Sequence, residues 1–183
     1  MIKNELVKEI HQNAVDHGWW DEERGLPEIV ALIHSELSEA LEEFRNGKPK
    51  FYYEMEEEAT LYADGMPVEK YERKKPEGIV VELADCVIRI LDYCGRRNID
   101  IAGVLEARRA GNDTYALPEL VAECHFLISQ AFKSGEEMPL YFAECINIIA
   151  FWCKENGGDL EEAIRIKHEY NKSRPYRHGG KKC

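Results

Sequence analysis

Two pairs of carboxylates recur at helical spacing in this sequence. Glu36 and Glu39 are three positions apart in one amphipathic segment, and Glu82 and Asp85 repeat that spacing in another. Residues at i and i+3 share one face of a helix, so each pair presents both carboxylates to the same neighbour. If the two helices pack antiparallel, the four carboxylates converge, and such a cluster needs a cation to stay ionised. Oxygen ligands of this kind suit Mg²⁺, with Mn²⁺ as a substitute.

Acidic pairs at this spacing are also common on solvated helix faces, so neither pair identifies a site by itself. The neighbouring residues separate the two interpretations. Glu36 lies between Ile33 and Leu37, and the segment Val80–Ile88 around Glu82 is mainly apolar. Acids embedded in apolar helices need a paired or metal-bound partner. The context therefore favours a metal site over a solvated face.

The elements that must position these acids are predicted to be helices. Apolar residues recur at intervals of three and four over most of the chain, as in amphipathic helices. Pro27 marks one helix start and Asn46-Gly47 its end, and Asp100 and Asp159 are residues that cap helix N-termini. We predict an all-α fold with helices over residues 2–16, 27–46, 77–96, 100–110, 117–134, 138–156 and 159–173.

Residues 47–78 interrupt this pattern. The segment contains aromatic residues such as Phe51 and Tyr53 and an acidic run from Glu54 to Glu58, but it has no clear period. A loop of this length inside a compact protein is usually a lid, a binding loop or an arm. An insertion without a role is the alternative interpretation.

An internal repeat relates the two parts of the chain. Leu26–Ala31 is echoed by Leu117–Ala122, and Ala84–Cys86 is echoed by Ala143–Cys145. Self-similarity of this kind indicates two related helical hairpins. We therefore predict one compact domain over 1–183, with a metal-binding half at 1–115 that contains the insertion 47–78, and a degenerate half at 116–183 that ends in a basic tail.

The second half lacks most of the acids. At the positions of Glu36, Glu39, Glu82 and Asp85 it carries Leu127, Gln130, Tyr141 and Glu144, respectively. A degenerate copy kept as a packing partner accounts for this better than two independent sites. One metal site per chain is therefore expected.

Three segments of the chain resemble a known family. HSELSEALEEFR (34–45), ELADCVIRILDYCG (82–95) and KHEYNKSRPYRHGGK (167–181) are similar to signatures of MazG-like, all-α nucleoside triphosphate pyrophosphohydrolases. The resemblance implies a helical bundle of the all-α NTP pyrophosphatase type. It also implies that the four acids bind Mg²⁺, and that a downstream Lys and Asn contact the phosphates of the nucleotide.

Carried over to this sequence, the phosphate-contacting residues are Lys167 and Asn171, with Arg174 as a further substrate-binding residue. Arg108 and Asn112 occupy the corresponding place in the first half and are the alternative pair. We favour Lys167 and Asn171, because the remainder of the C-terminal signature follows them.

The activity that the resemblance implies is Mg²⁺-dependent hydrolysis of a nucleoside or deoxynucleoside triphosphate to the monophosphate and pyrophosphate. A glutamate would take the proton of the attacking water, with Glu39 as first candidate and Glu43 as second. Trp19 and Trp20 are candidates for stacking on the base, with Trp20 as the one assigned to substrate binding, and packing in the core or at an interface is the alternative. A specific dUTPase-like or dCTPase-like enzyme and a non-catalytic nucleotide-sensing helical module are the competing functions.

Composition restricts the remaining classes. The net charge of −11 argues against a general nucleic-acid binder. No apolar stretch approaches the roughly 20 residues that span a bilayer, and the N-terminus has no signal-peptide pattern, so a cytoplasmic location without membrane contact is expected. The six cysteines form no CxxC pair and are interpreted as small core residues. The oligomeric state, including a homodimer, stays open.

Overall fold

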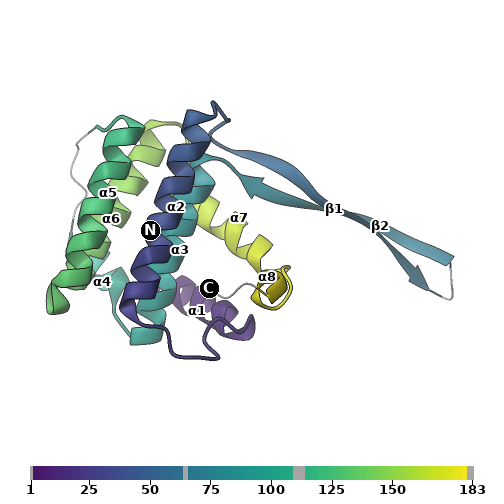
Figure 1. Ribbon diagram of the computed structural model, residues 1–183, viewed down its shortest axis with the longest axis horizontal. Helices are drawn as coiled ribbons and strands as arrows, with labels where there is room; N and C mark the ends of the chain where they lie inside the picture. Colours follow the sequence, from purple (N-terminus) through teal and green to yellow (C-terminus); the bar gives the residue numbers. More distant parts are fainter. Residues whose placement is uncertain (1, 64–65, 109–113, 181–183) are drawn as a thin grey trace.

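The computed structural model describes residues 2–63, 66–108 and 114–180, with residues 56–73 as backbone (Figure 1). The helices are α1 (Asn4–Asp16), α2 (Leu26–Arg45), α3 (Ile79–Arg97), α4 (Ile101–Ala107), α5 (Leu117–Lys133), the 3-10 turn η1 (Gly135–Glu137), α6 (Met138–Glu155), α7 (Leu160–Lys172) and the short C-terminal α8 (Arg177–Gly180). The predicted, mainly helical class is confirmed. Each predicted helix is present, although α4 ends at Ala107 and the predicted end at Ala110 lies outside the described residues.

The segment 47–78 differs from the all-α prediction. It forms an antiparallel hairpin of β1 (Tyr52–Ala63) and β2 (Met66–Glu77), which projects from the helical bundle as an arm (Figure 1). The strand register shifts after Met55 and again after Leu61. Such shifts break the two-residue alternation of a strand, which explains why the sequence shows no clear period here.

The junction between the hairpin and α3 requires a glycine. Gly78 has a φ of 111°, and a Cβ at this position would lie 2.7 Å from the carbonyl oxygen of Lys50. The same carbonyl accepts a hydrogen bond of 3.0 Å from the backbone amide of Val80, in the first turn of α3. The base of the hairpin thus fixes where α3 begins, and with it the position of Glu82 one turn further on.

Four helices form two antiparallel pairs, and the helix that follows each pair in the sequence packs on the other pair. α2 packs on α3, α5 packs on α6, and α2 also packs on α5 (Figure 1). The chain then crosses between the pairs, because α7 packs on α3 of the first half while α4 packs on α6 of the second. Each half therefore contributes one helix that packs on the second helix of the other half's pair.

Corresponding residues of the repeat meet where α2 faces α5. The rings of His34 and His125 stack with centroids 4.9 Å apart, and their Nδ1 atoms are 2.7 Å apart. Ser38 donates its hydroxyl to the carbonyl of His34 at 2.9 Å, and Ser129 does the same to His125 at 2.8 Å. Equivalent contacts on the two helices are what an approximate two-fold axis between them would produce.

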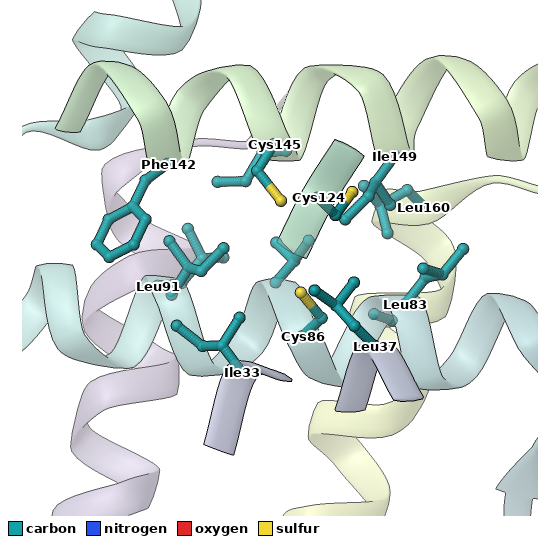
Figure 2. Packing of buried hydrophobic residues seen from close by; sticks show 14 of the residues in the cluster. Ile33, Leu37, Leu83, Cys86, Leu91, Cys124, Phe142, Cys145, Ile149 and Leu160 are labelled. Carbon is teal, nitrogen blue, oxygen red and sulfur yellow. The ribbon is translucent and has the colours of Figure 1, made fainter. Parts of the chain in front are cut away.

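Side chains from both halves share one hydrophobic core (Figure 2). Residues that come from different helices face one another in Figure 2: Ile33 and Leu37 from α2, Leu83, Cys86 and Leu91 from α3, Cys124 from α5, Phe142, Cys145 and Ile149 from α6, and Leu160 from α7. Because apolar side chains of both helix pairs are buried together in this core, the core holds the two pairs at a fixed relative position.

The expectation that the cysteines are core residues is met by the described part of the chain. The cysteines predicted to be core residues are buried and free at Cys86, Cys94, Cys124, Cys145 and Cys153, whereas Cys183 lies outside the described residues. None of the helices in the described parts of the chain has the length and apolar character that crossing a membrane requires.

Two phenylalanines provide a matched test of this core. Phe142 is fully buried and Phe126 is 55% exposed. We expect Phe142→Ala to lower the free energy of unfolding by about 3–5 kcal/mol, because it removes a large buried ring and leaves a cavity. Phe126→Ala should change it by less than about 0.5 kcal/mol. Urea denaturation followed by circular dichroism measures both, and similar losses in the two variants would contradict the shared core.

Candidate metal centre

Three carboxylates from α2 and α3 meet at one point between these helices. Glu36, Glu82 and Asp85 each present an oxygen, and these atoms lie within 4.8 Å of one another. We refer to these three residues as the acid trio. Glu36 and Glu82 are buried, with exposures of 7% and 5%, and Asp85 is partly buried. Clustered carboxylate oxygens are the donors that Mg²⁺ and Mn²⁺ prefer, so the residues fit a hard divalent cation.

The acid trio carries more negative charge than its surroundings neutralise. Burial, followed by the charge of Asp85, raises the pKa of Glu36 to about 7, although Arg89 opposes the shift. Burial and Asp85 likewise raise the pKa of Glu82 to about 9, against the opposing charge of Lys167. Without a cation these two groups retain protons near neutral pH. A divalent ion that replaced the protons would remove this cost.

Two basic side chains from different helices contact the acid trio. Nζ of Lys167, on α7, lies 2.8 Å from Oδ2 of Asp85 and is buried. Burial disfavours the charged form of Lys167, but the carboxylates of Asp85 and Glu82 outweigh this and raise its pKa above the usual value. Nε of Arg89, on α3, donates to Oε1 of Glu36 at 3.1 Å. The second half thus supplies a cation to acids of the first half.

The acid trio lines a polar cavity of about 300 Å³. Other side chains that line it and that bear on its chemistry are Trp19, Glu39, Lys75, His168, Asn171 and Arg174. Oδ1 of Asn171 and Nε2 of His168 are buried and find no hydrogen-bond partner among the described residues. Buried polar atoms in proteins are nearly always paired, so two such atoms on one cavity wall indicate groups that a ligand or water completes.

The predicted acidic residues do not all converge. Glu39 lines the cavity but is exposed, accepts a hydrogen bond of 3.1 Å from Oγ of Ser35, and is not part of the acid trio. Glu43 is not among the residues that line the cavity. It lies against the hairpin, where it hydrogen-bonds the hydroxyl of Tyr52; burial and this contact raise the pKa of Tyr52. The cluster therefore contains three of the four predicted metal ligands.

The predicted substrate-binding residues on the C-terminal segment reach the cavity. Lys167, Asn171 and Arg174 all line it, as expected for side chains three or four residues apart on α7 and its extension. The guanidinium of Arg174 lies 5.7 Å from the ring centroid of Tyr170. This placement supports the preference for Lys167 and Asn171 over Arg108 and Asn112 as the pair beside the acids.

Trp20 is not on the cavity wall and packs in the core, which is the alternative to its predicted base-stacking role. It is buried, and its indole Nε1 donates to both carboxylate oxygens of Asp92, at 2.9 and 3.1 Å. The preceding residue, Trp19, lines the cavity, with its ring 5.0 Å from that of His178 in an edge-to-face arrangement. The two tryptophans lie between helices, where no helical period shows which ring faces the cavity.

The second half has a counterpart of the Lys167–Asp85 contact but not of the acid trio. Nη1 of Arg108 donates to Oε2 of Glu144 at 2.8 Å, at a position where both side chains are exposed. Leu127 is buried in the core and Tyr141 packs against it, at the positions that correspond to Glu36 and Glu82. Within the described ranges, Glu144 belongs to no group of three ligand side chains. The alternative residue Asn112 lies outside these ranges.

Several residues at the site were not identified from the sequence. Arg89 follows Asp85 by four positions in an otherwise apolar helix, a signal that could have revealed it. His168 lies within the C-terminal signature, but nothing in the pattern showed it facing inward. Lys75 comes from the hairpin, where the lost alternation hid which side chains point to the bundle.

The raised pKa values predict how stability depends on pH. Glu36 and Glu82 have a reference pKa of 4.5 and folded values of about 7 and about 9, so between these limits the native state binds more protons than the unfolded state. The free energy of unfolding of metal-free protein should then fall as pH rises from about 5 to about 9. Thermal unfolding in EDTA across this range should show a decreasing Tm.

Two variants isolate the contribution of the acid trio to this slope. Glu82→Gln removes the group with the higher pKa, so it should flatten the decrease in Tm at the alkaline end. Glu144→Gln, at the exposed position of the second half, should leave the slope as in the wild type. A Tm that rises with pH in EDTA would contradict the shifts, and excess Mg²⁺ should flatten the wild-type slope.

Comparison with known proteins supplies no relative. No family model, curated protein or solved structure matches the chain. The function must therefore be argued from the residues of the cavity and from their geometry.

Proposed function

We propose that the protein hydrolyses a nucleoside or deoxynucleoside triphosphate to the monophosphate and pyrophosphate in the presence of Mg²⁺. The observation that carries the proposal is the meeting of the acid trio with a buried lysine in one cavity. The carboxylate oxygens lie within 4.8 Å of one another, and Nζ of Lys167 is 2.8 Å from Asp85. Phosphoryl-transfer sites combine carboxylate-held metal ions with a cationic side chain in this way.

The rest of the cavity is consistent with a nucleotide. Its volume of about 300 Å³ is at the lower end of the range for small-molecule sites. Trp19 offers an aromatic surface and Arg174 offers a guanidinium, the groups that bind bases and phosphates. The unpaired Oδ1 of Asn171 can accept a hydrogen bond from a substrate hydroxyl or amino group.

Each residue has a distinct part in the proposed mechanism. Glu36, Glu82 and Asp85 would hold the cation, which when bound neutralises phosphate charge and lowers the pKa of a water molecule. Lys167 contacts Asp85 and supplies positive charge beside the acid trio. Glu39 has an exposed carboxylate on the cavity wall, outside the acid trio, and is the residue placed to accept the proton of the attacking water.

The proposal includes the family type of the fold and the location. The two helix pairs that exchange α4 and α7 support a bundle of the all-α NTP pyrophosphatase type. The buried, free thiols of α3, α5 and α6 suit a reducing compartment. We therefore propose a cytoplasmic location. The oligomeric state, including a homodimer, stays open.

Pyrophosphate release from a panel of NTPs and dNTPs with Mg²⁺ tests the proposal. We expect turnover of at least one nucleotide by the wild type. Asp85→Asn should lower kcat/KM by about 100-fold or more, because it removes one negative charge from the acid trio and leaves Lys167 without its ion-pair partner. The matched control is Glu144→Gln, which changes the corresponding acid of the second half and should retain wild-type activity.

Each outcome of the panel has a separate meaning. Turnover confined to dUTP or dCTP would indicate the specific pyrophosphatase. Binding of nucleotides without turnover of any of them would indicate the sensing module and overturn the hydrolase. Equal activity of Asp85→Asn and Glu144→Gln would overturn the site assignment.

A further inference from the structure

The hairpin contributes one side chain to the cavity. Lys75 lies on β2, two residues before the strand ends at Glu77, and lines the same cavity as the acid trio. Its side chain is 35% exposed, whereas Lys74 beside it is exposed. Successive side chains of a strand point to opposite faces, so Lys75 points toward the bundle and Lys74 points away.

Lys75 is held in place by a neighbouring acid. Its Nζ forms an ion pair with Oε1 of Glu77, which is buried where β2 packs against α3 and α7. An ammonium group has three N–H donors, so this contact leaves donors of Lys75 for a ligand. Glu77 thus positions Lys75 at the cavity without saturating it.

The two other basic side chains beside the acids already form ion pairs with members of the acid trio. Lys167 contacts Asp85 at 2.8 Å and Arg89 contacts Glu36 at 3.1 Å, so both neutralise members of the acid trio. Glu77, the partner of Lys75, is outside the trio. Positive charge for additional phosphate groups must therefore come from side chains such as Lys75 and Arg174.

The order of groups along α3 places Lys75 at the end opposite the aromatic residues. Lys75 and Glu77 precede the first residue of α3, Glu82 and Asp85 lie in its first two turns, and Asp92 binds Trp20 near its other end. The ten residue steps from Glu82 to Asp92 cover about 15 Å of helix. A nucleoside beside the adjacent Trp19 would direct its phosphates past the acid trio toward Lys75, because all of these residues line one cavity.

We propose that Lys75 binds the terminal phosphates of the substrate, so that the hairpin makes the site selective for nucleotides with a phosphate chain over monophosphates. This inference rests on the proposed function. It also gives the insertion a role, because the hairpin is present in the half that retains the acids and its counterpart in the other half is the short η1 turn between α5 and α6.

Calorimetric binding and steady-state kinetics test the inference with Lys75→Gln, which keeps most of the stem and removes the charge. In Mg²⁺, we expect the Kd of a non-hydrolysable analogue of the best triphosphate substrate, and that of inorganic pyrophosphate, to rise about 10-fold or more. The Kd of the monophosphate should stay within about twofold. Lys75→Arg should restore part of the affinity, and Lys74→Gln, the exposed neighbour, should match the wild type.

The possible failures are distinguishable. An equal loss of affinity for triphosphate and monophosphate would show that Lys75 only supports the hairpin, and wild-type affinity in Lys75→Gln would show that it does not contact the substrate. Either result overturns the inference while leaving the hydrolase in place. A wild type that neither binds nor turns over any nucleotide overturns the proposed function, and the inference with it.

Discussion

The ion pair between Lys167 and Asp85 connects the parts of this molecule that matter for its chemistry. It joins α7 of the second half to α3 of the first, at the point where three carboxylates face one another. Removing one partner of a buried ion pair leaves an uncompensated charge, which typically destabilises a protein by about 3–5 kcal/mol. The acids therefore require the crossover of α7, and the crossover requires a second half on which α4 can pack in return. The site depends on the whole bundle rather than on the helix pair that carries the acids.

The exposed ion pair of Arg108 and Glu144 is the counterpart of Lys167 and Asp85 in the half that lacks the other acids. It occupies the corresponding position in the repeat and has the same 2.8 Å separation as Lys167 and Asp85. Both of its side chains are exposed, at 43% and 42%, where an ion pair contributes about 1 kcal/mol or less. Leu127 at the position of Glu36 is buried in the core instead. The second half has thus exchanged a charged site for apolar packing.

The parts of the fold that could be predicted from the sequence are those with a local signal. Helical period and capping residues such as Asp100, whose side chain accepts from the amide of Gly103, defined most helix boundaries. The i, i+3 acids on apolar helices predicted the members of the acid trio, together with Glu39, which lies outside it. The choice between Trp19 and Trp20, and the inward side chain of Lys75, depend on how separate segments dock, for which no local pattern exists. Register shifts in the hairpin removed even the two-residue alternation that marks a strand.

The anchoring of the hairpin also bears on the choice of general base. A two-stranded sheet is only marginally stable by itself, so the arm must be held at its base. Features that hold it there include the approach of Gly78 to Lys50, the hydrogen bond between Tyr52 and Glu43, and the burial of Glu77. Glu43 is therefore needed as the acceptor for the hydroxyl of Tyr52, away from the cavity. Glu39, one turn earlier on α2, lines the cavity, which supports it over Glu43 as the proposed acceptor of the proton.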